Sequence, residues 1–400
     1  MATPTENPFV TAATAGSASN PRSRPLVWRP RPPGAPVGDP LSTIKPAVRD
    51  LHPYTLKHFK APVKINQNEN PFDMPEAVKQ AVHLAVSETA WCRYPDFVPT
   101  SLISRLADFS RWKKEGVLVG NGSNELIEAL MVVVVERGKR VVIPQPTFTL
   151  YGMFARILGG DCRDVPLRPD LEFDGPRLLK EAREADLTIL CSPNNPTGGV
   201  LDRGDLERIL RQAGGLVVVD EAYHEFSRQS VAPLLERFDN LVVLRTFSKA
   251  MSMAALRVGY LLGRPELVEQ VAKAKLPYNL NVFSMAAASA ALEHFDLLQP
   301  QIERVIAERD RLWDGLNRIS GVEPFPSRAN FMVFRLAAEP GTVFRALCEE
   351  GILVRDVSRY PMLQQFLRVS VGLPRENDRF LAALSRIMKA HETKQGGGEG

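Results

Sequence analysis

The sequence predicts an α/β fold: a large, mostly parallel sheet with helices on both faces, followed by a second, smaller α/β domain. Three features of the 400-residue chain indicate this. Short apolar runs alternate with helical patterns, and the runs are continuous rather than alternating apolar and polar. Strand and helix patterns then resume after a long polar helix. Continuous apolar strands separated by helices are typical of parallel sheets that are buried on both faces.

Four apolar runs bounded by turn residues have the length of strands. They are Arg140–Ile143, Leu187–Cys191, Leu216–Val219 and Leu241–Leu244. A helix is expected to open at Ser123, because the apolar residues that follow recur at helical spacing through Val134. A second helix is expected over about 202–213, with Asp202 as its N-cap. In such sheets ligands bind at the carboxyl ends of the strands, so that edge is where chemistry is expected.

The rest of the chain divides by composition and pattern. A polar helix is expected from about 300 to 319, followed by strand and helix patterns to about 387. The expected organisation is a disordered Pro/Arg-rich tail, an N-terminal arm, a large domain, a small C-terminal α/β domain and a flexible tail: residues 1–45, 46–75, 76–295, 296–390 and 391–400.

Composition excludes several classes of function. The net charge is +4, but residues 1–45 carry five Lys/Arg against two Asp/Glu, which leaves +1 for the remaining chain. This gives no basic footprint for nucleic acid, and no apolar run has the length of a membrane span. The four cysteines are scattered and the six histidines lack ligand spacing, so we expect no metal site and a reducing, cytoplasmic location.

Polar residues follow three successive strands. Leu187–Cys191 leads to Asn195, Leu216–Val219 leads to Asp220 and Tyr223, and Leu241–Leu244 leads to Lys249 and Arg257. Taken singly, each has an ordinary explanation: a solvated lysine, an aspartate that forms a turn, an Asn-Pro-Thr-Gly turn. These residues occurring together, in this order along the chain, are a specific signal for a binding site, because all of them follow strands that end at one edge of the sheet.

These motifs resemble those of the fold-type I, class I/II aminotransferases, and more narrowly the histidinol-phosphate aminotransferase family. The resemblance covers about residues 46–390. The stretches that carry it are Asn68-Glu69-Asn70-Pro71, Arg93-Tyr94-Pro95, Gly120-Asn121-Gly122-Ser123-Asn124-Glu125, Asn194-Asn195-Pro196-Thr197-Gly198, Arg245-Thr246-Phe247-Ser248-Lys249-Ala250, Leu353-Val354-Arg355-Asp356 and Leu367-Arg368-Val369.

The resemblance implies pyridoxal 5′-phosphate (PLP) as cofactor. Lys249 would bind its aldehyde covalently and later carry the proton of the reaction. Asp220 would keep the pyridine nitrogen protonated, which makes the ring an electron sink. Tyr223 and Asn195 would donate hydrogen bonds to its phenolate oxygen, and Phe148 would stack on the ring.

The cofactor's phosphate has its own implied set of ligands. The turn at Gly122, Ser123 and Asn124 leads into a helix, so backbone amides and the helix dipole would face the anion. Side chains with hydroxyl or guanidinium groups would complete the site: Thr246, Ser248 and Arg257. Tyr94 would reach the phosphate bound by the partner subunit, which implies a homodimer; its ordinary explanation is a turn tyrosine packed by Pro95.

The implied reaction converts L-histidinol phosphate and 2-oxoglutarate to imidazole-acetol phosphate and glutamate in histidine biosynthesis. Arg368 would pair with a substrate carboxylate, while Arg355 and Tyr54 would contact the far end of the substrate and Asn195 would also border it. Alternatives on the same fold are an aromatic aminotransferase and a threonine-phosphate decarboxylase. A non-catalytic PLP-binding regulator is the alternative from a different class, but the 45-residue tail is too short for a winged-helix domain.

One stretch departs from the family pattern. Relatives usually carry two glycines between the lysine and the arginine, whereas this chain has Ser252 and Ala255 at those positions. The spacing is kept, so a position there that needs a positive φ would be strained.

Overall fold

The computed structural model describes residues 39–51 and 61–396, which fall into two units, the first ending at Arg49 and the second beginning at Asp50. In the first unit, a short 3-10 helix, η1 (Pro40–Thr43), and a one-turn helix, α1 (Pro46–Arg49), are described. The Asp39 side chain accepts a hydrogen bond from the Leu41 amide and so caps η1. The ordered turn at 40–43 therefore falls within the segment that was expected to be disordered.

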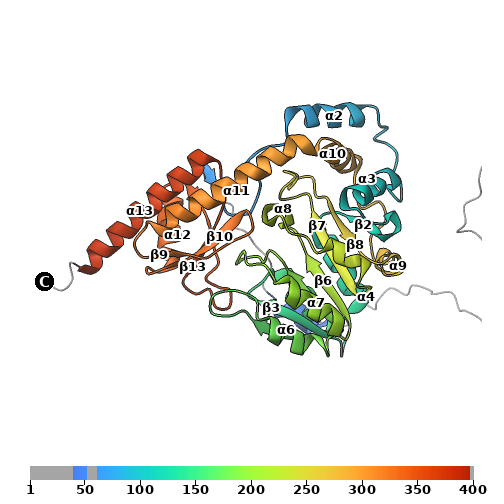
Figure 1. The fold of residues 1–400 in the computed structure, drawn as a ribbon, viewed down its shortest axis with the longest axis horizontal. Helices are drawn as coiled ribbons and strands as arrows, with labels where there is room; N and C mark the ends of the chain where they lie inside the picture. Colours follow the sequence, from blue (N-terminus) through green and yellow to red (C-terminus); the bar gives the residue numbers. More distant parts are fainter. Residues whose placement is uncertain (1–38, 52–60, 397–400) are drawn as a thin grey trace, which may run out of the picture. The chain divides into compact units, whose positions relative to one another are not determined.

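The second unit is built on a seven-stranded sheet with strand order β2-β8-β7-β6-β5-β3-β4 (Figure 1). Strands β3 to β7 pair in parallel, and β8 runs antiparallel between β7 and β2. The strands are β2 (Val117–Gly120), β3 (Arg140–Gln145), β4 (Asp161–Pro166), β5 (Leu187–Cys191), β6 (Leu216–Asp220), β7 (Leu241–Thr246) and β8 (Gly259–Leu262). The fold class predicted from the sequence and its four predicted strands are confirmed.

Helices cover both faces of this sheet. Side chains alternate along each strand, so Val217 and Val219 point into one core while Val218 points into the other. The first core contains α2 (Glu76–Ser87), α3 (Thr100–Ser110), α6 (Gly175–Ala182), α7 (Arg203–Gln212) and α10 (Val282–Glu293). The second contains α4 (Ser123–Val134), α5 (Thr149–Leu158) and α9 (Pro265–Ala272). Continuous apolar strands were the sequence signal for this two-sided burial.

A smaller antiparallel sheet of order β12-β13-β10-β9 follows the long helix α11 (Phe295–Asn317). Its strands are β9 (Val322–Pro324), β10 (Phe331–Leu336), β12 (Arg355–Asp356) and β13 (Phe366–Ser370), and helices α12 (Pro340–Glu349) and α13 (Pro374–Gly396) pack with them. Strand β1 (Val63–Lys64) forms a separate parallel pair with β11 (Ile352–Leu353). Three short helices remain. Helix η2 (Lys114–Gly116) precedes β2, and α8 (His224–Ser227) and η3 (Ala232–Glu236) lie between β6 and β7 in the chain.

Two helix boundaries differ from the sequence expectation. Helix α11 begins at Phe295 and contains Pro300, whereas a start near Pro300 was expected. Pro300 is the sixth residue of α11, where a proline removes one backbone hydrogen bond and its ring crowds the carbonyl group four residues earlier, yet the helix continues through it. Helix α13 continues to Gly396, past residue 390, where the tail was expected to begin. The polar residues at the C-terminal end of α13 still favour a helix, until the glycines that begin at Gly396.

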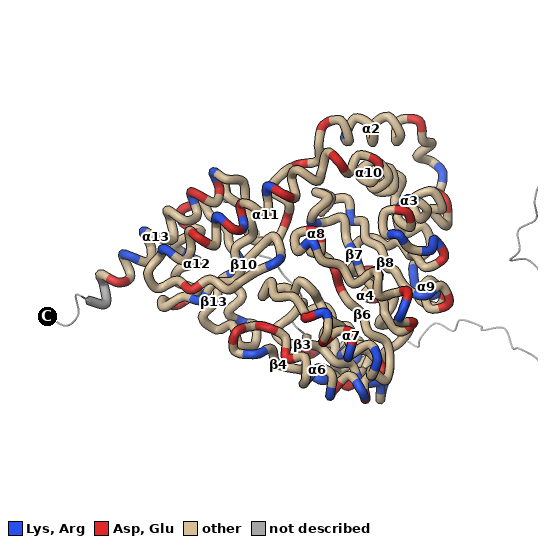
Figure 2. Tube along the Cα trace, viewed as in Figure 1, with Lys and Arg blue, Asp and Glu red and all other residues tan. Residues whose placement is uncertain are grey.

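Charged residues of both signs are interspersed along the helices (Figure 2). On α7, Glu207 forms ion pairs with Arg203 and Arg211 at i,i+4 spacing. In the part of the chain that the structure describes, no helix is both long and apolar enough to cross a bilayer.

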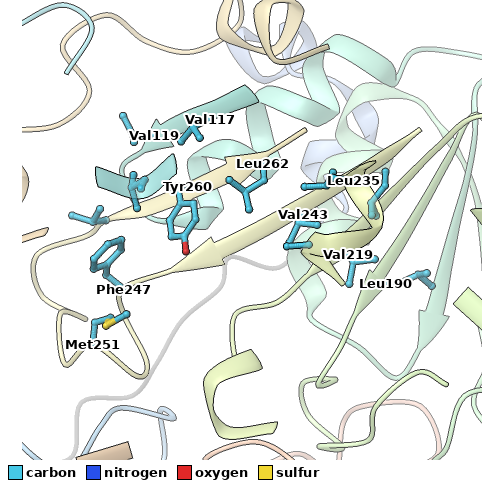
Figure 3. Close-up of a cluster of buried hydrophobic side chains, with 14 of the residues drawn as sticks. Val117, Val119, Leu190, Val219, Leu235, Val243, Phe247, Met251, Tyr260 and Leu262 are labelled. Carbon is cyan, nitrogen blue, oxygen red and sulfur yellow. The ribbon is translucent and has the colours of Figure 1, made fainter. Parts of the chain in front are cut away.

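The loop after β7 is anchored in the core on both sides of Lys249. Phe247 and Met251 are buried in the same core cluster, where the Phe247 ring meets Tyr260 (Figure 3). Ser252, where relatives carry glycine, has a φ of 55°, in the left-handed region. Its hydroxyl donates to the Phe72 carbonyl oxygen at 2.9 Å. The strain expected from the missing glycine is therefore present at this position, and Ala255 does not share it.

Two substitutions separate this strain from the hydrogen bond. Ser252→Ala keeps the left-handed backbone and loses the hydrogen bond, so it should destabilise the protein by about 1 kcal/mol. Ser252→Gly loses the same bond but removes a steric cost of roughly 1 kcal/mol. Urea unfolding followed by circular dichroism should therefore rank Gly above Ala. A glycine variant less stable than the alanine variant would show that position 252 is not strained.

Candidate active site

A cavity of about 480 Å³ lies where the large sheet, the small sheet and residues 66–69 meet. Twelve of the residues predicted from the sequence line it: Ser123, Asn124, Phe148, Asn195, Asp220, Tyr223, Thr246, Ser248, Lys249, Arg257, Arg355 and Arg368. They come from segments up to 245 positions apart in the chain, between Ser123 and Arg368. The expected convergence at the carboxyl edge of the sheet therefore occurs.

Strand register explains much of this convergence. In the β5–β6 pair Cys191 lies opposite Asp220, and in the β6–β7 pair Asp220 lies opposite Leu244. Three parallel strands therefore end side by side, and the residues just after them, including Asn195 and Lys249, reach the same space. The loop that carries Lys249 cannot swing away, because Phe247 and Met251 are fixed in the core (Figure 3).

Lys249 is held in a half-buried, electropositive position near Arg368 and Arg257. Its Nζ donates to the Gln67 carbonyl oxygen at 3.1 Å. Burial and, after it, the charge of Arg368 lower the pKa of Lys249 to about 8, while the charge of Glu69 opposes the change. A lysine with such a pKa is partly uncharged near neutral pH, which makes its amine a nucleophile and a proton acceptor.

Asp220 is a buried carboxylate with two hydrogen-bond donors. Oδ1 accepts from the Ala222 amide at 3.0 Å, and Oδ2 accepts from the Tyr151 hydroxyl at 2.6 Å. Burial raises the pKa of Asp220, and the hydrogen bond from Tyr151 opposes this rise. A carboxylate in this setting is suited to pair with a cationic N–H group that enters the cavity.

Neighbouring side chains donate to the oxygens of Tyr223 and Asn195, which leaves the hydrogens of both residues available as donors. Asn68 Nδ2 donates to the Tyr223 hydroxyl oxygen at 3.1 Å, so the tyrosine's own hydrogen remains a donor. Arg368 Nη1 donates to Asn195 Oδ1 at 2.6 Å, which leaves the Asn195 amide hydrogens as donors. Both side chains line the cavity, so together they can hold an anionic oxygen.

The start of α4 forms an anion cradle. Gly122 is the N-cap of α4, with a φ of 76°, and has no side chain to cap the first-turn amides. A Cβ at Gly122 would lie 2.3 Å from Arg257 Nη2, and one at Gly259 would lie 2.3 Å from the Ser123 amide nitrogen. Both glycines thus allow a close approach that other residues would block. Arg257 Nη1 donates to Ser248 Oγ at 3.0 Å, and the Thr246 hydroxyl accepts from the Ser248 amide at 3.1 Å.

The two arginines predicted to bind substrate are closer together than expected. Arg355 on β12 lies directly opposite Arg368 on β13 in the antiparallel register, so both project from the same face of the small sheet. Arg368 Nη2 also donates to the Asn66 carbonyl oxygen at 2.9 Å, and its guanidinium stacks over the Phe331 ring. Cavity walls with two guanidinium groups suit an anionic ligand.

Of the other predicted residues, Gly122 lies beside Arg257 at the start of α4 without lining the cavity, and Tyr94 also lies outside it. Tyr94 is 81% exposed, and its ring stacks on Tyr278 with centroids 4.6 Å apart. It does not line the cavity of its own chain. Tyr54 lies outside the described residues.

Sequence reasoning missed several residues that line the cavity: Asn66, Gln67, Asn68, Glu69, Tyr151 and Tyr360. Asn68 and Glu69 stood in a motif already noted, but nothing in their spacing assigned them a contact. Tyr151 follows Phe148 at i+3, a spacing that places both on one side of the helix start. Its hydrogen bond to Asp220 joins segments 69 positions apart, so only the fold reveals it.

The side chains present fit PLP. The amine of Lys249 matches an aldehyde, the buried Asp220 matches a pyridinium nitrogen, and the donors of Tyr223 and Asn195 match a phenolate oxygen. The uncapped start of α4 with Arg257 matches a phosphate, since Gly122 leaves open a cradle that a Cβ would fill.

Comparison with known proteins gives the family. The model of the family "Aminotransferase class I and II" matches residues 60–384. Histidinol-phosphate aminotransferases of Chlorobium phaeovibrioides and Chlorobaculum tepidum are 40% and 38% identical to the chain. These alignments cover 87% and 86% of this chain, and 98% and 100% of those proteins.

Solved structures share the fold. The histidinol-phosphate aminotransferase of Sinorhizobium meliloti in complex with pyridoxal-5′-phosphate aligns with a TM-score of 0.77 and 26% identity, covering 87% of this chain and 98% of that one. The L-threonine-O-3-phosphate decarboxylase of Porphyromonas gingivalis aligns with a TM-score of 0.72 over 82% of this chain and 99% of that one, but at 23% identity it shows the fold alone. The family model and the curated relatives agree: the chain belongs to the class I and II aminotransferase family.

Proposed function

We propose that this chain is a PLP-dependent transaminase that moves the amino group of L-histidinol phosphate to 2-oxoglutarate, giving imidazole-acetol phosphate and glutamate in histidine biosynthesis. The observation that carries the proposal is the convergence of Lys249, Asp220 and Arg257 on one cavity that also holds two arginines. The 40% identity to a histidinol-phosphate aminotransferase over nearly the whole chain supports this substrate.

Different residues of the chain act on different atoms of the cofactor and the substrate. PLP supplies an aldehyde for the amino group and a ring that accepts electrons from the substrate's α-carbon. Lys249 Nζ takes the proton from that carbon, since its pKa of about 8 suits proton transfer near neutral pH. Asp220 holds a proton on the ring nitrogen, and Tyr223 and Asn195 donate hydrogen bonds to the phenolate oxygen.

The substrate must be accepted in two forms. Histidinol phosphate carries a phosphate and no α-carboxylate, whereas glutamate carries two carboxylates. We assign Arg368 and Arg355 to these anions, with Tyr54 near the far end of the substrate. Their cross-strand pairing gives the site two neighbouring guanidinium groups, and these can meet a phosphate or a carboxylate in turn.

A homodimer is part of the proposal. Exposed apolar and aromatic side chains gather in two loops, 88–99 and 273–281: Trp91, Tyr94, Phe97, Val98, Leu276 and Tyr278. Phe97 meets the Tyr278 ring edge-on, beside Tyr94. Such a surface suits burial against another subunit, with Tyr94 reaching the partner's phosphate site.

The four unpaired cysteines suit a cytoplasmic enzyme.

The pKa of Lys249 predicts how cofactor attachment depends on pH. Only the uncharged amine attacks an aldehyde, so covalent attachment of PLP to the apoenzyme should accelerate about tenfold per pH unit below pH 8 and level off above it. Borohydride trapping followed by mass spectrometry measures the rate, and Lys249→Ala should give no label. A rate that still climbs towards pH 10 would mean that Lys249 behaves as an ordinary lysine.

Arg355 tests the choice of donor. Removing a charge-assisted contact costs about 2–5 kcal/mol when the partner charge stays buried. Arg355→Ala should therefore lower kcat/KM for histidinol phosphate by about 30-fold or more, with a much smaller effect on phenylalanine. Arg359→Ala, an exposed arginine of the same loop, is the matched control. Phenylalanine as the better wild-type donor would indicate an aromatic aminotransferase, and release of carbon dioxide from threonine phosphate would indicate the decarboxylase.

Subunit mixing tests the role of Tyr94. Tyr94→Ala and Lys249→Ala should each be inactive alone, but a mixed dimer should regain activity because one of its two sites is intact. Differently tagged chains verify that subunits exchange. If exchange is complete and activity does not return, Tyr94 acts within its own chain or has no part in the site.

A further inference from the structure

Tyr151 is a fully buried tyrosine at the floor of the cavity. It lies in the first turn of α5, three residues after Phe148, and the two rings meet edge-on with centroids 5.5 Å apart. One short segment therefore carries both the residue assigned to stack on the cofactor and a hydroxyl that points at Asp220. The proposed function so far gives Tyr151 no role.

The hydroxyl of Tyr151 has a defined hydrogen-bond partner. It donates to Asp220 Oδ2 at 2.6 Å, within the range of a short bond to a charged acceptor. The other oxygen, Oδ1, accepts from the Ala222 amide. Since each carboxylate oxygen has two acceptor sites, the side of Asp220 that borders the cavity can still take a further donor.

We propose that Tyr151 is a positioning residue for the cofactor's ring nitrogen: its hydroxyl holds the Asp220 carboxylate in place and keeps it ionised. This inference rests on the proposed function, in which Asp220 is the partner of that nitrogen. A carboxylate fixed by two donors cannot rotate away from the ring. One that stays negatively charged favours a proton on the ring nitrogen.

The surroundings of Asp220 explain why a donor is needed there. Burial raises the pKa of Asp220, the hydrogen bonds from Tyr151 and Ala222 oppose that rise, and the charge of Glu221 adds to it. Burial and the nearby Asp220 charge raise the pKa of Tyr151 well above its usual value, so the hydroxyl stays protonated and remains a donor. The titratable groups whose charges act on Asp220 come from α5, β5, the segment after β6 and the loop after β7: Tyr151, Cys191, Glu221, Tyr223 and Lys249.

The apoenzyme provides a test that needs no cofactor. Because burial raises the pKa of Asp220 above its unfolded value, ionising this group costs stability as the pH rises through the folded pKa. Tyr151→Phe removes a donor to the ionised form, so its destabilisation should grow as the pH rises through the raised pKa of Asp220, reaching about 10- to 100-fold in the unfolding equilibrium constant. In the Asp220→Asn background the effect of Tyr151→Phe should not depend on pH.

A purely structural tyrosine gives a different result. Tyr260→Phe is the matched control, because Tyr260 is also buried in the sheet but its hydroxyl faces Arg245, at 3.4 Å from Nη1. Its effect on urea unfolding should be constant over the same pH range. If Tyr151→Phe behaves like Tyr260→Phe, or is equally pH-dependent with Asn at position 220, the proposal is overturned.

Cofactor binding gives the second measurement. Fluorescence titration of the apoenzyme should show PLP bound about 10-fold more weakly by Tyr151→Phe than by wild type, with Tyr260→Phe unchanged. For a PLP analogue with carbon in place of the ring nitrogen, the difference between Tyr151→Phe and wild type should vanish. An equal loss for both ligands would overturn the assignment to the ring nitrogen. Failure of the wild type to bind PLP would instead refute the proposed function, and the apoenzyme result would stand by itself.

Discussion

Parallel pairing of β5, β6 and β7 determines where the groups of the cavity lie. Their register puts Cys191 beside Asp220 and Asp220 beside Leu244, so the segments that follow the three strands enter the same space. The pairing depends in turn on two-sided burial, because each strand presents apolar side chains to helices on both faces. A shift of one residue in β6 would turn Asp220 to the opposite face of the sheet and remove it from the cavity.

Two consecutive carboxylate residues at the end of β6, Asp220 and Glu221, are both buried but have different partners. Glu221 points to the other side of the sheet from Asp220 and pairs with Arg245, with Oε2 to Nε at 2.9 Å, and Ser230 donates to the same oxygen. That pair is buried and satisfied within the protein, as a buried ion pair must be. Among the residues that the structure describes, the hydrogen-bond donors to Asp220 are the neutral groups of Tyr151 and Ala222, so its charge remains available to a ligand.

Residues from the two ends of the chain complete the cavity. The Lys249 amine contacts the Gln67 carbonyl oxygen, and Arg368 joins Asn195 of the large sheet to the Asn66 carbonyl oxygen. Asn68 has a φ of 55°, and it bonds both Tyr223 and Ser370. Segment 66–68 is therefore held between the two sheets by hydrogen bonds to residues that also define the site, which ties the position of the small sheet to the geometry around Lys249.

The sequence by itself determined the fold class, the four central strands and the main polar groups of the cavity. Continuous apolar runs report burial directly, and residues that follow parallel strands must meet at one edge, so Asn195, Asp220 and Lys249 could be assigned from local pattern. It also identified the stretch with two missing glycines, whereas the structure decided that Ser252 and not Ala255 has the positive φ.

Only the tertiary structure decided which distant groups touch. The donor to Asp220 is Tyr151, the acceptor from Arg368 is Asn195, and Arg355 lies across from Arg368. None of these follows from spacing, because each joins segments brought together by packing or by strand register. Helix ends were uncertain for a related reason: α11 continues through Pro300, although proline disfavours the interior of a helix. Local patterns specify which elements form, whereas side-chain contacts between elements depend on the packing of the whole unit.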